Sequence, residues 1–549
     1  MSTPTTDRES AAAANPGPGR TVRDATFDLL RRRGLTRMFA NPGSTEIPFL
    51  SGLPGDLEFV LALHEGSVIG MATGYAIGRD EASLALLHTT AGLGNAVGAI
   101  ATARVNRAPV VIVVGQQDRR HLSYEPFLSG RLAGLAGEYP VRVEQPATAQ
   151  DVPAAIERAA HAAVTARGPA LVIVPMDDWE APADDTREPA AAAGRVLREQ
   201  AVHPDSVQAL VGFLQSSASP AIVVGAGADD ADTWAGLVAL AERLAAPVYE
   251  AAFEARAGFP QDHPRFAGFL PAERSRLRER LAQHDAVLVV GAPAFRVTLY
   301  TPGAFTNPGT RLAVVTDDTE EAYRSPSELA ILAHPAAVCR AVADALPQRE
   351  GDEPERTAPP VPQRGERLTS FNVLHELAQR LPRNAVVLEE APVDRPHITT
   401  YLPAKEPLGY LSAAMGGLGF AIPAATGLRM AQPNRPIVAI VGDGSSIYGI
   451  QGVWSAAHYK VGAVFVVLSN GGYAIMDRLA EAHGEAGPWP SFDEIHLAAV
   501  AQGFGCPAKR IETHDELTST LDELVPTLEE REEPLFLDVV VDPTPEFTA

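Results

Sequence analysis

The chain has 549 residues, 46 % of them hydrophobic, and its 68 acidic and 45 basic side chains give a formal net charge of −23. This length exceeds what one hydrophobic core usually serves, so we expect three domains of ordinary size. The acidic balance opposes nucleic acid or an anionic membrane as a partner, because both bind basic surfaces.

The sequence indicates neither export nor a disulfide framework. Residues 1–20 lack the basic start and apolar core of a signal peptide, and no uncharged apolar run reaches the roughly 20 residues of a membrane span. The two cysteines, Cys339 and Cys506, lie far apart without CxxC spacing. We therefore expect a soluble, cytoplasmic protein with a disordered leader over residues 1–20 and no membrane partner.

Two stretches rich in Pro, Ala and charge, without apolar periodicity, divide the chain. One runs on from Ala181, and the other covers residues 347–368. They predict a first domain over residues 21–185, a middle domain over residues 200–346 and a last domain over residues 369–549.

Each part alternates apolar, strand-like runs with stretches long enough for a helix. The first part contains TRMFANPG, SLALLHTT, PVVIVVG and PALVIVP. The middle part contains PAIVVGAGAD, DAVLVVGAPAF and RLAVVTDD, and the last contains NAVVLEEAP, RPIVAIVGDGS, AVFVVLSN and PLFLDVVVD. Such alternation is typical of parallel sheets covered by helices. The sequence therefore predicts an α/β protein with three doubly wound parallel-sheet domains.

The glycine-rich run VVGAGADD in the middle part has two interpretations. It follows a predicted strand, as a dinucleotide-binding loop would. It lacks the full GxGxxG spacing, however, so a tight turn is favoured.

An acid ends the strand-like run IVAIVGDGSS. Asp443 stands where the strand must stop, so it either caps the next helix or holds a cation at the carboxyl end of parallel strands. The next strand delivers Asn470 and the turn NGGY to the same edge, and oxygen ligands of this kind suit Mg²⁺ beside a phosphate. The helix that follows Gly444 would point its first amides at that phosphate.

These motifs carry a resemblance to a known family. GDGS followed by NGGY resembles the cofactor motif of thiamin-diphosphate-dependent enzymes. The segments NPGSTEIPF, LHEGSVIGMATGYA and LLHTTAGLGNAVGA, in that order, resemble the benzoylformate decarboxylase family over nearly the full chain, and GQQDRR, VPMDDW and GAPAFR extend the match. The resemblance implies thiamin diphosphate and Mg²⁺ as cofactors and a small-molecule 2-oxo acid as substrate.

The resemblance also implies an assembly. The first domain would bind the cofactor's pyrimidine and the last its diphosphate, with each active site between the first domain of one subunit and the last domain of another. A homodimer is then the least assembly, and a homotetramer is usual in the family.

By the same resemblance, Mg²⁺ would be held by Asp443, Asn470 and the backbone carbonyl of Gly472. The helix-cap alternative for Asp443 loses weight, because a cap predicts nothing about NGGY. The carbonyl of Gly416 would accept from the cofactor's 4′-amino group, and Leu418 would bend the cofactor into its reactive shape. The residues expected against the cofactor are Glu65, Asn95, Gly416, Leu418, Gly444, Ser445 and Tyr473.

Three residues of the first domain match the family's catalytic groups. Glu65 would hydrogen-bond the pyrimidine nitrogen N1′, and this role is favoured over the alternative of an exposed acid that opens a helix. His88 matches the active-site histidine, against the alternative of a packed core residue, and Ser44 matches the serine that touches the substrate carboxylate, against an ordinary turn residue. Asn95 would line the same pocket, and His64 is expected to be structural.

The substrate shell departs from the family. Thr298 stands where benzoylformate decarboxylases have a second histidine, and threonine cannot exchange protons near neutral pH. Pro392 and Val393 replace hydroxyl residues after the glutamate Glu390. Ser412 takes an aromatic position. The residues expected to line the substrate pocket are Ser44, His88, Thr298, Ser412, Ile475, Met476 and Leu479.

The resemblance implies non-oxidative decarboxylation of a benzoylformate-like 2-oxo acid to an aldehyde and CO₂. A carboligase or lyase of the acetolactate synthase or benzaldehyde lyase kind is an alternative that the altered pocket permits. A second alternative, from another class, is a cofactor-binding regulatory subunit with weak catalysis.

Overall fold

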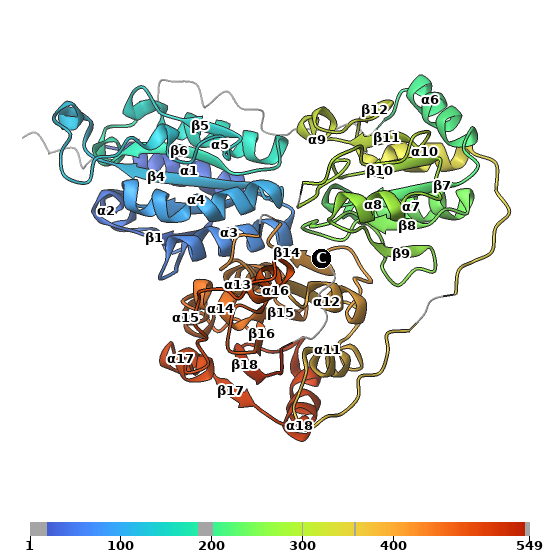
Figure 1. Cartoon of the computed structure of the whole chain (residues 1–549). Helices are drawn as coiled ribbons and strands as arrows, with labels where there is room; N and C mark the ends of the chain where they lie inside the picture. Colours follow the sequence, from blue (N-terminus) through green and yellow to red (C-terminus); the bar gives the residue numbers. More distant parts are fainter. Residues whose placement is uncertain (1–18, 185–200, 299, 356–357, 415, 544–549) are drawn as a thin grey trace, which may run out of the picture.

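The structure is a computed structural model that describes residues 19–184, 201–298, 300–355, 358–414 and 416–543. It contains three six-stranded sheets in which all paired strands are parallel, and helices cover each sheet. Figure 1 shows the first and middle domains side by side, with the last domain in contact with both. The predicted fold class is therefore confirmed. Most of the predicted leader, and residues 185–200 of the first linker, lie outside the described residues.

The first domain has the strand order β2-β1-β3-β4-β6-β5. Its central strands β3, β4 and β6 are buried along their whole length, as expected of apolar runs between two helical layers. The elements are α1 (Val22–Arg33), β1 (Arg37–Asn41), η1 (Ser44–Glu46), α2 (Ile47–Leu50), β2 (Glu58–Leu61), α3 (Glu65–Arg79), β3 (Ser83–Leu87), α4 (Thr89–Val105), β4 (Val110–Gln116), η2 (Arg119–Tyr124), η3 (Leu132–Gly134), β5 (Arg142–Glu144), η4 (Ala149–Asp151), α5 (Val152–Thr165), β6 (Ala170–Pro175) and η5 (Met176–Glu180).

The middle domain has the strand order β12-β11-β10-β7-β8-β9. The run VVGAGADD forms the end of β7 and a tight 3-10 turn, η6, in which the backbone N–H of Ala226 donates to Glu254 (3.0 Å). The elements are α6 (Pro204–Gln215), β7 (Pro220–Val224), η6 (Ala226–Ala228), α7 (Ala231–Leu244), β8 (Val248–Glu250), β9 (Phe266–Phe269), α8 (Arg274–Arg280), β10 (Ala286–Val290), β11 (Arg311–Thr316), α9 (Thr319–Tyr323), β12 (Leu329–Leu332) and α10 (Pro335–Ala345).

The last domain has the strand order β14-β13-β15-β16-β18-β17. The described part of residues 347–368, which precedes it, contains no helix or strand. The elements are α11 (Ser370–Ala378), β13 (Val386–Glu390), α12 (Arg395–Tyr401), β14 (Tyr410–Ser412), α13 (Ala421–Ala431), β15 (Ile437–Gly442), α14 (Asp443–Gly449), α15 (Gly452–His458), β16 (Val464–Ser469), α16 (Ala474–Ala482), α17 (Leu497–Gly503), β17 (Ala508–Ile511), α18 (His514–Leu524), η7 (Val525–Thr527) and β18 (Leu535–Val540).

Helices α3 and α13 join the first and last domains. A Cβ atom on Gly74 of α3 would overlap the carbonyl of Ala424, and one on Gly427 of α13 would overlap the carbonyl of Met71. The two glycines therefore allow the helix backbones to touch, and alanine at either position would push the domains apart. None of the helices in the described ranges is both long and apolar enough to cross a membrane.

Candidate active site

The first group of polar residues lies at the carboxyl ends of the neighbouring strands β2, β1 and β3. Glu65 is the first residue of α3, and its oxygens accept from the side-chain amides of Asn41 (3.2 Å) and Asn95 (3.1 Å). His64 caps the same helix, since its Nδ1 accepts from the N–H of Gly66 (3.0 Å). The cap fixes the helix start and so positions Glu65, which agrees with the structural role expected for His64.

His88, the residue before α4, is held by a buried carboxylate. Its Nδ1 lies 2.9 Å from Oε2 of Glu46 and 2.9 Å from the hydroxyl of Thr45, which itself donates to Oε1 of Glu46 (2.5 Å). Glu46 is only 1 % exposed, and it also accepts from the N–H of Gly43 (2.7 Å). An ionised carboxylate only accepts, so an ionised Glu46 favours the tautomer of His88 in which Nδ1 carries the proton and Nε2 is left for the site.

The packing around this pair leaves no room for other side chains. A Cβ atom on Gly115 of β4 would overlap the Glu46 carboxylate, and one on Gly43 would meet the His88 ring at 2.5 Å. Ser44 begins the turn η1 with its residue exposed, beside the buried Thr45. Sequence reasoning identified Ser44 and His88 but missed Thr45 and Glu46.

The second group lies at the carboxyl ends of the neighbouring strands β13, β15 and β16. The Asp443 carboxylate accepts from the backbone N–H groups of Gly444 (2.7 Å), Asn470 (2.9 Å) and Gly471 (2.7 Å). Burial raises the pKa of Asp443, against the lowering by these three donors. Asp443 is the first residue of α14 rather than its N-cap, so the helix-cap interpretation does not describe its contacts.

Small residues allow close packing around Asp443. A Cβ atom on Gly444 would meet the ring of Tyr473 at 2.6 Å, and that ring packs against Phe492 with 5.0 Å between centroids. Ser445 is buried beside Gly444. The side-chain oxygen of Asn470 accepts from the N–H of Gly472 (3.2 Å), so its carbonyl faces this turn.

Glu390, the last residue of β13, anchors the loop that leads into α13. Its oxygens accept from the backbone N–H groups of Gly419 (2.5 Å), Phe420 (2.8 Å) and Ala421 (2.5 Å). Burial raises the pKa of Glu390 to about 7. Gly416, in the same loop, has φ of +66°, which an L side chain rarely adopts.

Comparison with known proteins decides the family. The thiamine pyrophosphate enzyme N-terminal TPP binding domain matches residues 20–136, the central domain matches residues 207–342, and the C-terminal TPP binding domain matches residues 396–539. This chain belongs to the thiamine pyrophosphate enzymes. Both cofactor-binding domains are present, so thiamin diphosphate is its cofactor, and Mg²⁺ is the usual companion ion in these enzymes.

Individual relatives within the family are similar over almost the whole chain. A benzoylformate decarboxylase of Pseudomonas aeruginosa is 37 % identical, covering 91 % of this chain and 96 % of the relative. A Mycobacterium tuberculosis protein named as a candidate acetolactate synthase large subunit is 30 % identical, covering 90 % and 95 %. The solved structure of a 4-hydroxybenzoylformate decarboxylase of Rhodococcus jostii has a TM-score of 0.90 at 34 % identity, covering 96 % and 100 %.

The second group fits the diphosphate and metal end of a thiamine pyrophosphate enzyme. A buried carboxylate and a side-chain amide oxygen are ligands that Mg²⁺ accepts, and the ion prefers few protein ligands beside phosphate oxygens. The described residues contain no cluster of three or more His, Cys, Asp or Glu that could hold a metal. A cation there would offset the cost of burying the Asp443 charge.

The predicted substrate-pocket residues lie on different elements and differ in burial. Met476 and Leu479, on α16, are 42 % and 40 % exposed, and Ile475 precedes them on the same helix. Ser412 is fully buried on β14, and its hydroxyl donates to the carbonyl of Glu254 (3.1 Å) in the middle domain. It therefore sits at the junction between the last and middle domains.

The residues that depart from the family lie on two different domains. Thr298 is an exposed residue of the middle domain, and its N–H donates to the carbonyl of Ala272 (3.0 Å). Val393 is buried and Pro392 half-buried, just after Glu390. Their role in a substrate pocket stays a prediction.

Proposed function

We propose that this thiamine pyrophosphate enzyme decarboxylates an aryl 2-oxo acid to an aldehyde and CO₂, with thiamin diphosphate and Mg²⁺. The observation that carries the proposal is the pair formed by Glu46 and His88, at the same sheet edge as Glu65. A histidine that a buried acid holds in one orientation can transfer protons in catalysis. A protein that only binds the cofactor does not need such a group. The likeness to decarboxylases of benzoylformate and 4-hydroxybenzoylformate supports the substrate class.

When bound, the cofactor supplies the electron sink for the loss of CO₂. The chain's own residues bind the cofactor and the substrate, and they transfer protons. Glu65 hydrogen-bonds the pyrimidine nitrogen, Ser44 orients the substrate carboxylate, and Nε2 of His88 exchanges protons with the substrate. Asp443 and Asn470, with the carbonyl of Gly472, would hold Mg²⁺ at the diphosphate end of the site.

We further propose that each active site forms between two subunits, so that the enzyme is at least a homodimer and, as is usual in the family, a homotetramer. Large apolar side chains beside both groups are exposed in the single chain. Ile47, which follows Glu46, and Leu63, two positions before Glu65, are 53 % and 41 % exposed. Beside the second group, Tyr448 of α14 is 55 % exposed, and Met476 and Leu479 of α16 are 42 % and 40 % exposed. Such surface is normally covered in the assembled protein.

A mixed-subunit experiment tests this arrangement. Glu65→Gln and Asp443→Ala subunits, carrying different tags and co-expressed, form heterodimers that can be purified on both tags. If the sites lie between subunits, one of the two sites recovers an intact Glu65 and an intact Asp443, and about half of the wild-type activity per dimer returns. Heterodimers as inactive as either parent would contradict an intersubunit site.

The substrate class is tested by CO₂ release from aryl and alkyl 2-oxo acids, with and without thiamin diphosphate and Mg²⁺. We expect benzoylformate and its 4-hydroxy derivative to react faster than alkyl 2-oxo acids, because the exposed side chains of α16 would give the substrate an apolar wall. If the fully loaded enzyme released no CO₂ from any 2-oxo acid, the proposed function would be overturned.

We place the enzyme in the cytoplasm, where its two buried free cysteines would stay reduced.

A second candidate activity, carboligation to a 2-hydroxy ketone, is favoured by Thr298 and by the likeness to the acetolactate synthase-named relative. Product analysis separates the two activities, because decarboxylation alone yields aldehyde and CO₂. The retained Glu65 and His88, with the Glu46 contact, oppose the alternative of a catalytically weak regulatory subunit.

A further inference from the structure

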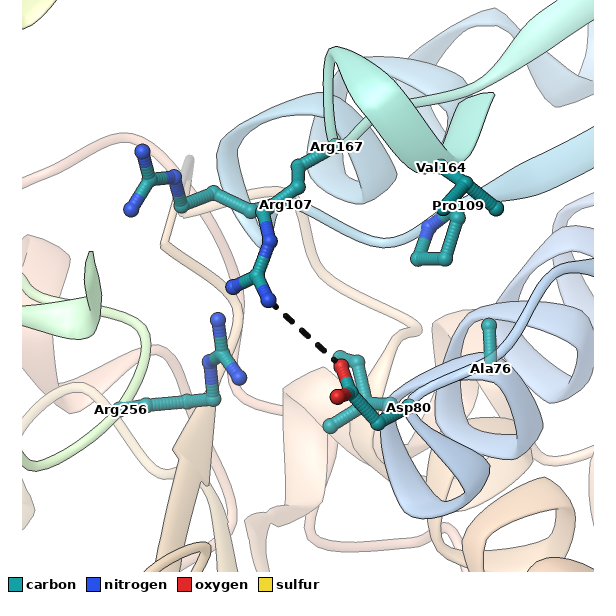
Figure 2. Close-up of a pocket in the computed structure, with 8 residues that line it drawn as sticks. Ala76, Asp80, Arg107, Pro109, Val164, Arg167 and Arg256 are labelled. Atoms are coloured by element: carbon teal, nitrogen blue, oxygen red, sulfur yellow. Dashed lines mark ion pairs between the residues drawn. The ribbon is translucent and has the colours of Figure 1, made fainter. Parts of the chain in front are cut away.

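A cavity of about 140 Å³ lies where the first domain meets the middle domain (Figure 2). The first domain contributes the end of α3, the turn before β4 and the end of α5, and the middle domain contributes the loop after β8. The lining residues are Ala76, Ile77, Asp80, Arg107, Pro109, Val164, Arg167 and Arg256. The last domain is close by, because Arg256 forms an isolated β-bridge with Leu411.

The lining is strongly cationic. Three of the eight lining residues are arginines, and the only acid among them, Asp80, has a side chain that is 89 % exposed and lies 3.7 Å from Arg167. In Figure 2 the guanidinium groups of Arg167 and Arg256 face each other from the two domains. Burial lowers the pKa of Arg256, and the charges of Arg167 and Arg107 lower it further. The acids Asp317, Asp318 and Glu321 offset the charge of Arg107, and Asp229 offsets part of that of Arg256, so the repulsion that an anion would relieve is mainly that between Arg256 and Arg167.

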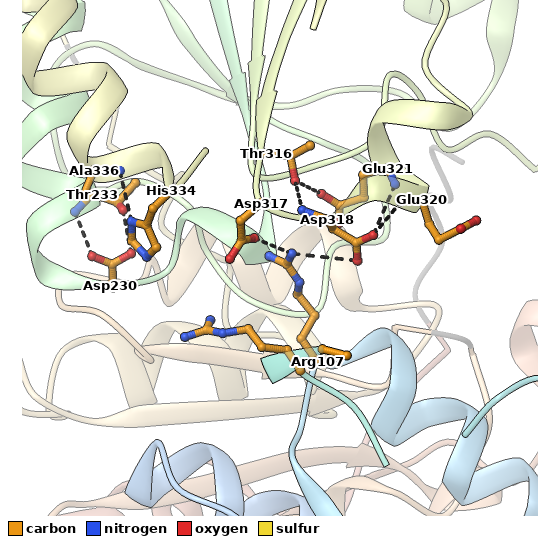
Figure 3. A network of polar contacts seen from close by, with 12 residues as sticks. Arg107, Asp230, Thr233, Thr316, Asp317, Asp318, Glu320, Glu321, His334 and Ala336 are labelled. Carbon is orange, nitrogen blue, oxygen red and sulfur yellow. Dashed lines mark hydrogen bonds and ion pairs between the residues drawn. The ribbon is translucent and has the colours of Figure 1, made fainter. Parts of the chain in front are cut away.

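Two of the arginines carry buried donors that lack partners among the described residues. Arg107 is 7 % exposed, and one of its terminal nitrogens donates to Asp317 at the end of β11 (2.7 Å), as Figure 3 shows. Its Nε and other terminal nitrogen are buried without a partner, and so is Nε of Arg256. Arg256 has only a distant ion pair with Asp229, at 3.6 Å. These nitrogens are enclosed by protein atoms, so an anion in the cavity would meet the arginine charges rather than these particular donors.

The size of the cavity limits the acceptor. An engineered apolar cavity of about 150 Å³ holds benzene, with its six non-hydrogen atoms. A phosphate ion has five, whereas a nucleotide would not fit inside. Guanidinium groups match phosphate oxygens with paired hydrogen bonds, and phosphate neutralises more charge than a single carboxylate.

We propose that this cavity binds a phosphate dianion, either inorganic phosphate or the phosphoryl group of a larger molecule whose remainder extends into solvent. The site does not depend on the proposed reaction. It lies at the C-terminal end of α3, whereas Glu65 begins that helix, about 20 Å away for 15 residues. Phosphate there would link the arginines of two domains and so strengthen the junction between them.

The test uses the holoenzyme with saturating thiamin diphosphate and Mg²⁺, so that the diphosphate site is filled. Inorganic phosphate is titrated at constant ionic strength, and the melting temperature and calorimetric binding are followed. We expect a saturable rise in melting temperature, because a ligand that binds only the folded state stabilises it. A shift that KCl of equal ionic strength reproduces would overturn the proposal.

Variants locate the binding. Arg167→Ala removes the least buried of the three arginines and should weaken phosphate binding at least tenfold, and Arg256→Lys, which keeps the charge but loses the paired donors, should weaken it as well. Arg142→Ala, an exposed arginine of the same domain that pairs with Glu144, is the matched control and should bind like wild type. Unchanged affinity in Arg167→Ala would overturn the proposal.

Diffraction provides a measurement that needs no variant. Wild-type crystals soaked in selenate should show an anomalous selenium peak between Arg107, Arg167 and Arg256, and its absence would overturn the site.

A phosphomonoester, titrated into the holoenzyme as inorganic phosphate is, identifies the source of the ligand. Binding as tight as that of inorganic phosphate points to the phosphoryl group of a larger molecule, and weaker binding points to inorganic phosphate.

Discussion

His88 and Glu46, 42 positions apart in the chain, are joined by a 2.9 Å hydrogen bond between Nδ1 and Oε2. The turn after β1 and the end of β3 bring them together, because neighbouring parallel strands end at the same edge of a sheet. The carboxylate is buried and also bound by Thr45 and by the N–H of Gly43, so it cannot turn away. It therefore selects the form of His88 in which Nε2 can take a proton.

Glu46→Gln is predicted to lower kcat by about 10²-fold, the low end of what a positioned proton-transfer group contributes. Glutamine keeps the shape but loses the charge that holds the Nδ1 proton. His88→Ala should cost about 10²- to 10⁴-fold, and Glu46→Gln should cost little more in that background, because the two residues act as a unit. Steady-state kinetics of the single and double variants checks this. The control is Glu58→Gln, a half-exposed acid paired with Arg37, and additive losses would contradict the coupling.

Much of the fold could be predicted from the sequence, and the strands that the apolar runs did not include are all short. The eleven apolar runs singled out all form strands, whereas the six edge strands, β2, β5, β9, β12, β14 and β17, together with β8, were not among those runs. These strands have only three or four residues, and most of the edge strands are partly exposed. A short, half-exposed strand has too few apolar residues to give a periodic signal.

In the candidate site, too, residues with a local sequence signal could be predicted and residues with only distant partners could not. The sequence pointed to Asp443 and Asn470 because each closes an apolar run and stands beside glycine. Glu46 was missed because an acid in the first turn after NPGS is ordinary, and nothing local points to its contact with His88. Arg107 was missed for the same reason, since its partner Asp317 lies 210 positions away in another domain.

Glu65→Gln is predicted to bind thiamin diphosphate with only a modest loss but to exchange the cofactor's C2 proton much more slowly. The amide fits between Asn41 and Asn95 but cannot share a proton with the pyrimidine nitrogen. Hydrogen–deuterium exchange at C2, followed by NMR, measures this without turnover. Exchange at the wild-type rate would remove Glu65 from the catalytic groups.

Asp443→Ala is predicted to lose retention of thiamin diphosphate and its dependence on Mg²⁺. The change removes the buried carboxylate and leaves three backbone N–H groups without their acceptor. Cofactor binding is measured by calorimetry with and without Mg²⁺, and Asp522→Ala, an exposed acid of α18, is the control. Wild-type affinity in Asp443→Ala would show that the metal assignment is wrong.

Glu390 should make stability depend on pH. Its pKa of about 7 in the folded chain lies above the ordinary 4.5, so the folded state binds this proton more tightly than the unfolded state. The stabilisation is complete below about pH 4.5 and is lost as the pH rises through 7. The melting temperature of wild type relative to Glu390→Gln should therefore fall between these pH values. The control is Glu406→Gln, an acid with a half-exposed side chain. A difference that stays constant or rises with pH would contradict the raised pKa.

Thr298 should influence which product is released. A histidine at this position can protonate the intermediate that remains after CO₂ has left, whereas the threonine hydroxyl is too weak an acid to do so near neutral pH. That intermediate should then live longer and capture an added aldehyde more often, and the smaller side chain leaves room for one. We predict a substantial share of 2-hydroxy ketone when a 2-oxo acid is turned over with excess aldehyde, and a smaller share in Thr298→His. Chromatography of both products, with Thr301→His as a control on the same loop, measures the ratio. Equal ratios in wild type and Thr298→His would show that another group or a water molecule protonates as fast, and would remove the main support for carboligation.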